Sequence, residues 1–218
     1  MSFLHWPYPP DVVQAMLPDG LTVDEYDGAA WVGLVPFRLE VRVPGVPFIP
    51  WVGRFVETNV RTYVRAADGT RGIWFLSLDA QRLGAVVVAR TMWSLPYQWS
   101  RMRLARAGSV ITYECRRRWP GADHPTSRVV LRVGDDYQPD ELDDLDHFLS
   151  ARWVLFSRKR GALVRTRAHH VAWPLRHATV LEVDDHLLRA AGLPPPVGAP
   201  RALYSDGVTV RLGPRRPR

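Results

Sequence analysis

The chain has 218 residues, of which 46% are hydrophobic and 23% charged, a size and composition typical of one globular domain with a large core. Its single cysteine, Cys115, excludes an internal disulfide framework, and its longest apolar run, around Leu83 to Val88, is too short to cross a bilayer. The net charge of +7 suggests nucleic-acid binding as one function to consider. The 28 arginines and one lysine are scattered among acidic residues, however, so nucleic acid is not the expected partner. The N-terminus lacks the basic start of a signal peptide, so we expect a cytoplasmic protein with no membrane partner.

The first hundred residues predict short strands separated by tight turns, together with two helices. A short helix is expected over 9–20, and residues 42–54, rich in proline and glycine, are expected to form a loop. The strongest helix prediction covers 80–93, with Asp79 as its N-cap. Apolar or alternating patterns predict strands over 21–26, 30–37, 55–66 and 72–79.

The second half continues this pattern. Helices are expected over 140–151, which has an acidic start, and over 185–191. The basic tail 214–218 is expected to be flexible, which leaves 1–213 as a single domain. Strands are expected over 102–106, 110–118, 127–133, 153–157, 162–168, 179–183, 202–204 and 208–212, the last two as a hairpin. Because strands outnumber helices and most connections are tight turns, the pattern favours an antiparallel barrel or sandwich over a parallel fold.

Common signatures of chemistry are absent from the sequence. It contains no glycine-rich phosphate loop, no convincing metal-ligand spacing and no serine nucleophile elbow. Cys115 lies in the middle of an expected strand, which favours a packed thiol over a nucleophile. We therefore predict neither a bound metal nor a cofactor.

One strand carries a polar face. In 55–66, Glu57, Asn59, Arg61 and Tyr63 alternate with Val and Thr residues, so they share one side of the strand. Such a face is either the solvated side of a sheet or a polar network inside a barrel. The aromatic neighbours on that side and the apolar loop before the strand favour the second interpretation. A carboxylate held beside an arginine in a cavity can position a polar substrate or act as a base.

Seven segments together resemble the YqjF-like family, within the acetoacetate decarboxylase-like superfamily. They are FLHW (3–6), LPDGLTVDEYDGAAWVGLVPF (17–37), FVETNVRTYV (55–64), GIWFLSLDA (72–80), LPYQWSRM (95–102), WPL (173–175) and YSDGVTVRLGPRR (204–216). The resemblance implies a mainly β fold: a closed, antiparallel, cone-like barrel with an internal cavity and two or three flanking helices.

The same resemblance argues against Schiff-base chemistry. In the decarboxylases, a lysine that follows a Gly-aromatic-Pro turn forms a Schiff base with the β-keto acid. The corresponding turn here is 95–98, Leu-Pro-Tyr-Gln, which contains no lysine. Lys159, the single lysine of the chain, is expected at a solvated hairpin tip. Glu57 resembles a cavity glutamate of the decarboxylases, so the carboxylate is kept where the lysine is missing.

The leading hypothesis is a small-molecule-binding barrel that acts on a carboxylate or carbonyl metabolite without a Schiff base. In it, Glu57 is the base or orienting group, Tyr97 donates a hydrogen bond, and Arg61 or Arg101 binds an anion. The other candidate ligand-binding residues are Asn59, Tyr63, Trp74 and Trp99. The alternative is a non-catalytic ligand sensor or carrier, and nucleic-acid binding is a third hypothesis. A homo-oligomer stays open, because decarboxylase relatives assemble into larger oligomers.

Overall fold

The computed structural model describes residues 1–42, 53–138 and 140–217, so most of the loop expected over 42–54 lies outside the described residues. In the described part, thirteen strands join in one sheet. The strands are β1 (Ser2–Tyr8), β2 (Leu21–Val23), β3 (Ala30–Glu40), β4 (Arg54–Ala66), β5 (Arg71–Ala80), β6 (Tyr97–Ala107), β7 (Val110–Trp119), β8 (Thr126–Asp136), β9 (Val154–Lys159), β10 (Ala162–His169), β11 (Leu175–Asp185), β12 (Arg201–Ser205) and β13 (Arg211–Pro217). The helices are α1 (Pro10–Gln14), α3 (Leu83–Val88), α4 (Asp144–Ser150), α5 (Leu187–Ala190) and the π-helical turn η1 (Ala89–Trp93).

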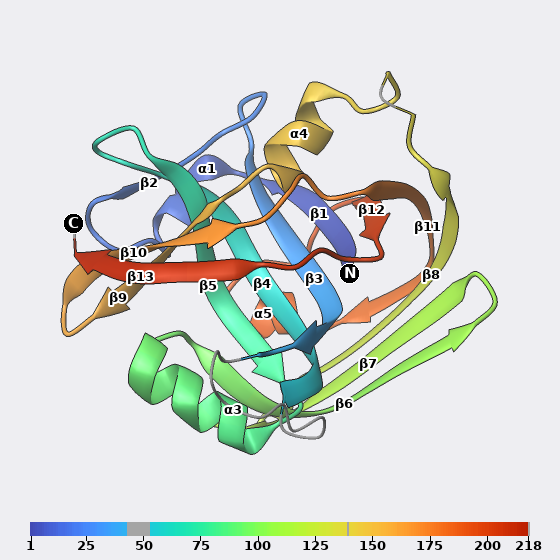
Figure 1. The fold of residues 1–218 in the computed structure, drawn as a ribbon, viewed down its shortest axis with the longest axis horizontal. Coiled ribbons are helices and arrows are strands. Elements are labelled where there is room, and N and C mark those ends of the chain that lie inside the picture. Colours follow the sequence, from blue (N-terminus) through green and yellow to red (C-terminus); the bar gives the residue numbers. More distant parts are fainter. Residues whose placement is uncertain (43–52, 139, 218) are drawn as a thin grey trace.

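Nine of these strands close into a barrel. Around the ring they run β5, β6, β7, β8, β11, β12, β1, β3 and β4, and β4 pairs again with β5. Neighbours in the ring are antiparallel except β5 and β6, which are parallel. The expected mainly β, closed, cone-like barrel is therefore confirmed, and the described residues add four short α-helices beside it (Figure 1).

The sheet forks at β5. The first half of β5 pairs with β9, at Ile73 and Trp74, while its end pairs with β6, from Leu78 to Ala80. From β9 the sheet continues through β10 to β13, and Figure 1 shows these strands passing in front of β4 and β5. Strand β4 therefore has one side toward the ring and the other toward this outer layer.

An apolar cluster occupies the interior of the ring. Its members come from opposite sides of the barrel, such as Leu4 in β1, Val60 in β4, Ile111 in β7 and Leu131 in β8. Because side chains alternate along a strand, Val60 on the inside puts the odd-numbered residues of β4 on the outside of the ring. The polar face of β4 is thus turned toward the outer layer, and it does not line the inside of the ring, where the sequence favoured placing it.

The structure differs from the sequence prediction in three ways near the ends of the chain. Strand β1 was missed, because prolines at its end obscure the pattern, and it pairs with both β3 and β12. The expected hairpin of 202–204 with 208–212 does not form: β12 pairs with β1 and β11, whereas β13 pairs with β10. Strand β13 extends to Pro217, so the tail expected to be flexible is a paired strand up to that residue.

Asp79 does not cap a helix. It is the penultimate residue of β5, and its buried carboxylate accepts hydrogen bonds from Ser100 (2.7 Å) and from the Arg117 guanidinium (2.9 and 2.8 Å). This ion pair keeps the chain extended through Ala80, and α3 begins at Leu83 without a side-chain cap. A local capping preference was outweighed by a contact between distant strands.

Candidate functional site

The polar face of β4 is buried. The exposed fractions are 3% for Glu57, 3% for Asn59, 9% for Arg61 and 0% for Tyr63. Helix α3 packs near the start of the strand, where Phe55 lies in one cluster with Val86, and α4 packs near its end against Tyr63. The face is therefore not the solvated side of the sheet, and its polar groups must find partners inside the protein or on a ligand.

At one end of this face, Glu57 meets Tyr97. Strand β6 starts beside Leu78 of β5, and the Tyr97 hydroxyl donates a 2.9 Å hydrogen bond to Oε2 of Glu57. Burial raises the pKa of Glu57 to about 8; the hydrogen bond from Tyr97 opposes this rise, and the nearby Asp79 charge adds to it. A carboxyl group with such a pKa can both donate and accept a proton near neutral pH.

In the middle of the face, Arg61 has no carboxylate partner among the described residues. Its guanidinium lies over the rings of Phe3 and Tyr63, at 5.5 and 5.9 Å from the ring centroids. Within the described residues no acidic side chain forms an ion pair with it, and its Nε has no hydrogen-bond partner. The sequence of residues 43–52, which are not described, contains neither Asp nor Glu. A buried guanidinium of this kind attracts an anion.

At the other end, Tyr63 joins three elements. Its hydroxyl donates a 2.6 Å hydrogen bond to the backbone oxygen of Leu149, next to the end of α4, and lies 2.7 Å from Nε2 of His5 in β1. Arg152 stacks on the Tyr63 ring at 5.1 Å and binds Asp24 at 3.0 Å. Burial, with the charge of Arg71 next in importance, lowers the pKa of Arg152 to about 10. Arg65 and Arg71 also bind Asp24, so three arginines share one carboxylate and the region stays positive.

His5 fits because its neighbour in β3 is a glycine. A Cβ atom on Gly33 would lie 2.7 Å from Nε2 and 2.8 Å from Cδ2 of the His5 ring. The ring is fully buried and bonded to Tyr63, so it has little freedom to move away.

We therefore expect Gly33→Ala to lower the free energy of unfolding by about 1–3 kcal/mol, through displacement of His5. Urea unfolding followed by tryptophan fluorescence measures this change. The control is Gly84→Ala in α3, where an added Cβ meets no atom of the described residues within 4 Å and where the higher helix propensity of alanine should stabilise by about 0.5–1 kcal/mol. Equal effects at the two positions would contradict the proposed role of Gly33.

The structure brings together most of the predicted site residues, but not all. Trp99, like Tyr97, belongs to the cluster around Phe55, at the Glu57 end of the face. Trp74 has the opposite parity in β5 and packs with Phe156 on the other side of the sheet. Arg101 is exposed on β6, so neither it nor Trp74 joins the buried face.

Three buried or half-buried participants were missed by sequence reasoning. They are His5, Arg152 and Asp24, which reach Tyr63 only through contacts between distant parts of the chain. The single available signal was His5 in the FLHW segment, since an isolated histidine among apolar residues of a strand is a candidate for a buried polar contact.

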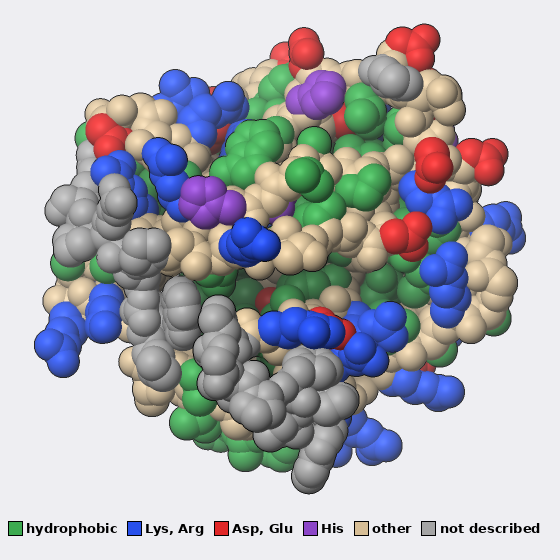
Figure 2. Space-filling model, viewed as in Figure 1, with side chains coloured by type: hydrophobic (Ala, Val, Ile, Leu, Met, Phe, Trp, Pro, Cys, Tyr) green, Lys and Arg blue, Asp and Glu red, His purple; other side chains and the backbone are tan. Residues whose placement is uncertain are grey.

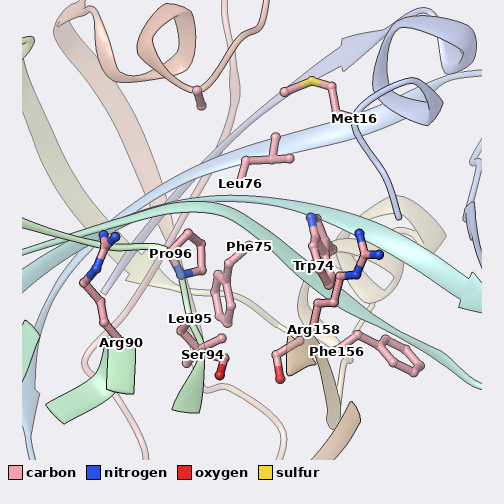
Figure 3. A pocket seen from close by; sticks show the side chains of 12 residues that line it. Met16, Trp74, Phe75, Leu76, Arg90, Ser94, Leu95, Pro96, Phe156 and Arg158 are labelled. Carbon is pink, nitrogen blue, oxygen red and sulfur yellow. The ribbon is translucent and has the colours of Figure 1, made fainter. Parts of the chain in front are cut away.

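A pocket of about 470 Å³ lies beside β5, between β9 and the segment that leads into β6. Figure 3 shows Trp74 and Phe75 of β5 in it, with Leu95 and Arg90 to one side and Phe156 and Arg158 to the other. Phe75 is also the cross-strand neighbour of Arg61, so this strand is shared by the pocket and the polar face.

The face of the molecule drawn in Figure 2 has a hollow in its surface. Hydrophobic side chains lie in the hollow, and basic side chains lie along one rim.

In the described part of the chain, no group of three or more His, Cys, Asp or Glu side chains is placed to hold a metal ion. Among the same residues, no helix has the length and apolar character needed to cross a membrane.

Solved structures that are similar to this fold include acetoacetate decarboxylase-like enzymes. An acetoacetate decarboxylase-like enzyme from Sphingomonas wittichii RW1 is similar with a TM-score of 0.66 and 15% identity, covering 100% of this chain and 89% of that one. The acetoacetate decarboxylase of Legionella pneumophila is similar with a TM-score of 0.63 and 15% identity, covering 100% and 84%. The enduracididine biosynthesis enzyme MppR, solved with pyruvate, has a TM-score of 0.64 and 14% identity, covering 99% and 86%. At these identities the likeness shows the fold.

Sequence similarity shows the family to which the chain belongs. The protein YqjF of Bacillus subtilis (strain 168), described as uncharacterized, is 33% identical over 217 residues, which cover 98% of this chain and 88% of that protein. Residues 1–209 match the family DUF2071, described as an uncharacterized conserved protein. The chain therefore belongs to the DUF2071 family, and it has an acetoacetate decarboxylase-like fold.

Proposed function

We propose that this protein binds a small organic carboxylate at the buried face of β4 and transfers a proton next to the carbonyl group of that ligand. The observation that carries the proposal is Arg61, a buried guanidinium without an acidic partner among the described residues. A carboxylate would supply the missing charge and match the two-pronged geometry of the guanidinium. MppR, which has this fold, is described in complex with pyruvate, a small oxo acid.

Glu57 is the proposed proton carrier. Its pKa of about 8 lies near physiological pH, where general acid–base catalysis is most efficient. Tyr97 holds the carboxyl group in place through its hydrogen bond. As carboxylate, Glu57 takes a proton from the carbon next to the carbonyl, which leaves an enolate and a neutral Glu57, and the reverse step returns the proton. Lys159 is exposed at the end of β9, so a Schiff base is not part of this proposal.

The test uses pyruvate in D2O. Proton NMR should show exchange of its methyl protons for deuterium, faster with protein than without it, and faster as the pH rises through about 8. Glu57→Gln should slow this exchange by about 100-fold or more while pyruvate still binds, because glutamine cannot take the proton. Arg61→Met should abolish binding, which isothermal titration calorimetry measures.

The control is Arg103→Met, which removes an exposed arginine of β6 and should leave both readouts unchanged. If no small carboxylate binds, or if binding survives Arg61→Met, the proposal is wrong. Binding without exchange would favour the ligand carrier or sensor over the enzyme.

A further inference from the structure

Three buried polar atoms on the face around Arg61 lack hydrogen-bond partners among the described residues. They are Nδ1 of His5, Oδ1 of Asn59 and Nε of Arg61. His5 and Arg61 are both cross-strand neighbours of Gly33, and Asn59 lies two residues before Arg61 on the same side of β4. Leaving a buried polar atom unpaired is costly, so three of them together point to a ligand that pairs with them.

The hydrogen bonds of Tyr63 determine the chemical character of the His5 atom. The backbone oxygen of Leu149 can only accept, so the single hydroxyl hydrogen of Tyr63 is donated there. The Tyr63 oxygen must then accept from Nε2 of His5, which therefore carries the ring hydrogen. Burial, followed by the charge of Arg61, lowers the pKa of His5 well below its ordinary value, so the ring is neutral. Its Nδ1 is consequently a hydrogen-bond acceptor.

The site thus offers one kind of donor and two acceptors. Arg61 supplies the donors, and a carboxylate satisfies them. His5 Nδ1 and Asn59 Oδ1 are acceptors, which neither a carboxylate nor a carbonyl oxygen can satisfy. The missing groups on the ligand are hydrogens bound to oxygen or nitrogen.

Building on the proposed function, we infer that the preferred ligand is a small carboxylate that also carries a hydroxyl or amino group, whose hydrogen is donated to Nδ1 of His5. A site with buried acceptors discriminates strongly against an analogue that lacks the donor, because the acceptors then stay unpaired. The ligand class is therefore small acids that carry a hydroxyl or amino group in addition to the carbonyl of the proposed proton transfer, rather than plain acids or simple oxo acids.

The experiment compares ligand pairs that differ by a single hydroxyl group. Calorimetry gives the affinities of hydroxypyruvate and pyruvate, and of lactate and propionate. In at least one pair, the hydroxylated acid should bind the unmodified protein about tenfold more tightly or better. Equal affinities within both pairs, with binding that still depends on Arg61, would overturn this inference and leave the proposed function standing. If none of the four acids binds, the proposed function itself fails.

Two variants of His5 separate its two nitrogens. In His5→Gln, the side-chain amide nitrogen can replace Nε2 and keep the contact with Tyr63, but the acceptor at Nδ1 is lost. The preference for the hydroxylated acid should then fall to about twofold or less, while the affinity for the plain acid changes little. In His5→Asn, the side-chain oxygen can replace Nδ1, so the preference should largely persist. A preference unchanged in His5→Gln would contradict the role of Nδ1.

A measurement on the unmodified protein covers the case in which these variants do not fold. With histidine labelled by nitrogen-15, the Nδ1 signal of His5 should be that of an unprotonated nitrogen. It should shift when the preferred hydroxylated acid is added and stay in place with its deoxy partner. A protonated Nδ1, or equal shifts with both acids, would overturn the inference.

Discussion

Replacing Arg61 with methionine is expected to raise the free energy of unfolding by about 1–2 kcal/mol while it removes anion binding. The guanidinium is 9% exposed, has no acidic partner among the described residues and leaves its Nε unpaired. Its stacking on Phe3 and Tyr63 offsets part of the cost of burying the charge. Methionine has a similar length and fills the same space without the charge, so the fold gains what the site loses.

Arg117→Met is the matched control, because Arg117 is also a buried arginine of the barrel, at 8% exposed. Its guanidinium makes two hydrogen bonds to Asp79, so the substitution leaves a buried carboxylate without its charge partner. We expect a loss of about 3–5 kcal/mol. Chemical unfolding of both variants in a buffer free of small carboxylates measures the two changes. If Arg61→Met destabilises as much as Arg117→Met, then Arg61 is a structural residue and the anion site is wrong.

The opposite signs expected for these arginines reflect the two sides of the barrel wall. The Arg117 pair is satisfied within the protein, where β5, β6 and β7 meet. On the buried face of β4, by contrast, Asn59 and Arg61 have polar atoms without partners among the described residues. The rest of the fold holds these atoms and the positive charge of Arg61 in place. Uncompensated polar groups of this kind are a usual feature of binding sites, where they are paired by the ligand.

The polar face itself could be predicted from sequence, because alternation in β4 depends only on the neighbouring residues. Glu57, Asn59, Arg61 and Tyr63 lie on one side of the strand, as the period of two requires. Whether that side is solvated could not be deduced, since the covering elements are remote in sequence: Tyr63 contacts Leu149, 86 residues away. The same holds for His5, which is 58 residues from Tyr63.

Errors in the elements have a similar physical origin. Asp79 is a good N-cap residue by local preference, but the buried ion pair with Arg117 decides its conformation. The sequence predicted a last hairpin of 202–204 with 208–212. In the fold each segment finds a longer partner, β12 beside β1 and β13 beside β10. In both cases a contact with a distant strand, which no local pattern encodes, outweighed the local prediction.

Glu57→Gln is expected to make the protein more stable than the unmodified chain at alkaline pH, and the gain should depend on pH in a defined way. In the unfolded chain the carboxyl group ionises near its ordinary pKa of 4.5, whereas in the folded protein burial raises that pKa to about 8. Between these values the folded protein keeps a proton that the unfolded chain has released. The stability that Glu57 contributes is therefore fully present below about pH 4.5 and is lost as the pH rises through about 8.

Glutamine does not ionise, so the difference in unfolding free energy between Glu57→Gln and the unmodified protein should be flat below about pH 4.5. It should then grow in favour of the variant by on the order of 3–5 kcal/mol up to about pH 8. Urea unfolding at a series of pH values measures it, and the titrations of groups that do not interact with Glu57 cancel in the difference.

Tyr97→Phe sharpens this test, because the Tyr97 hydroxyl donates the hydrogen bond that opposes the rise in the pKa of Glu57. Without it, the pKa should rise further and the loss of stability should extend to higher pH. A difference between Glu57→Gln and the unmodified protein that does not change with pH would show that Glu57 ionises normally. A carboxylate that ionises normally would be a weaker base toward the ligand, and the proton exchange would lose its expected rise with pH near 8. This titration therefore tests whether the raised pKa, on which the efficiency of Glu57 as proton carrier depends, is present in the fold.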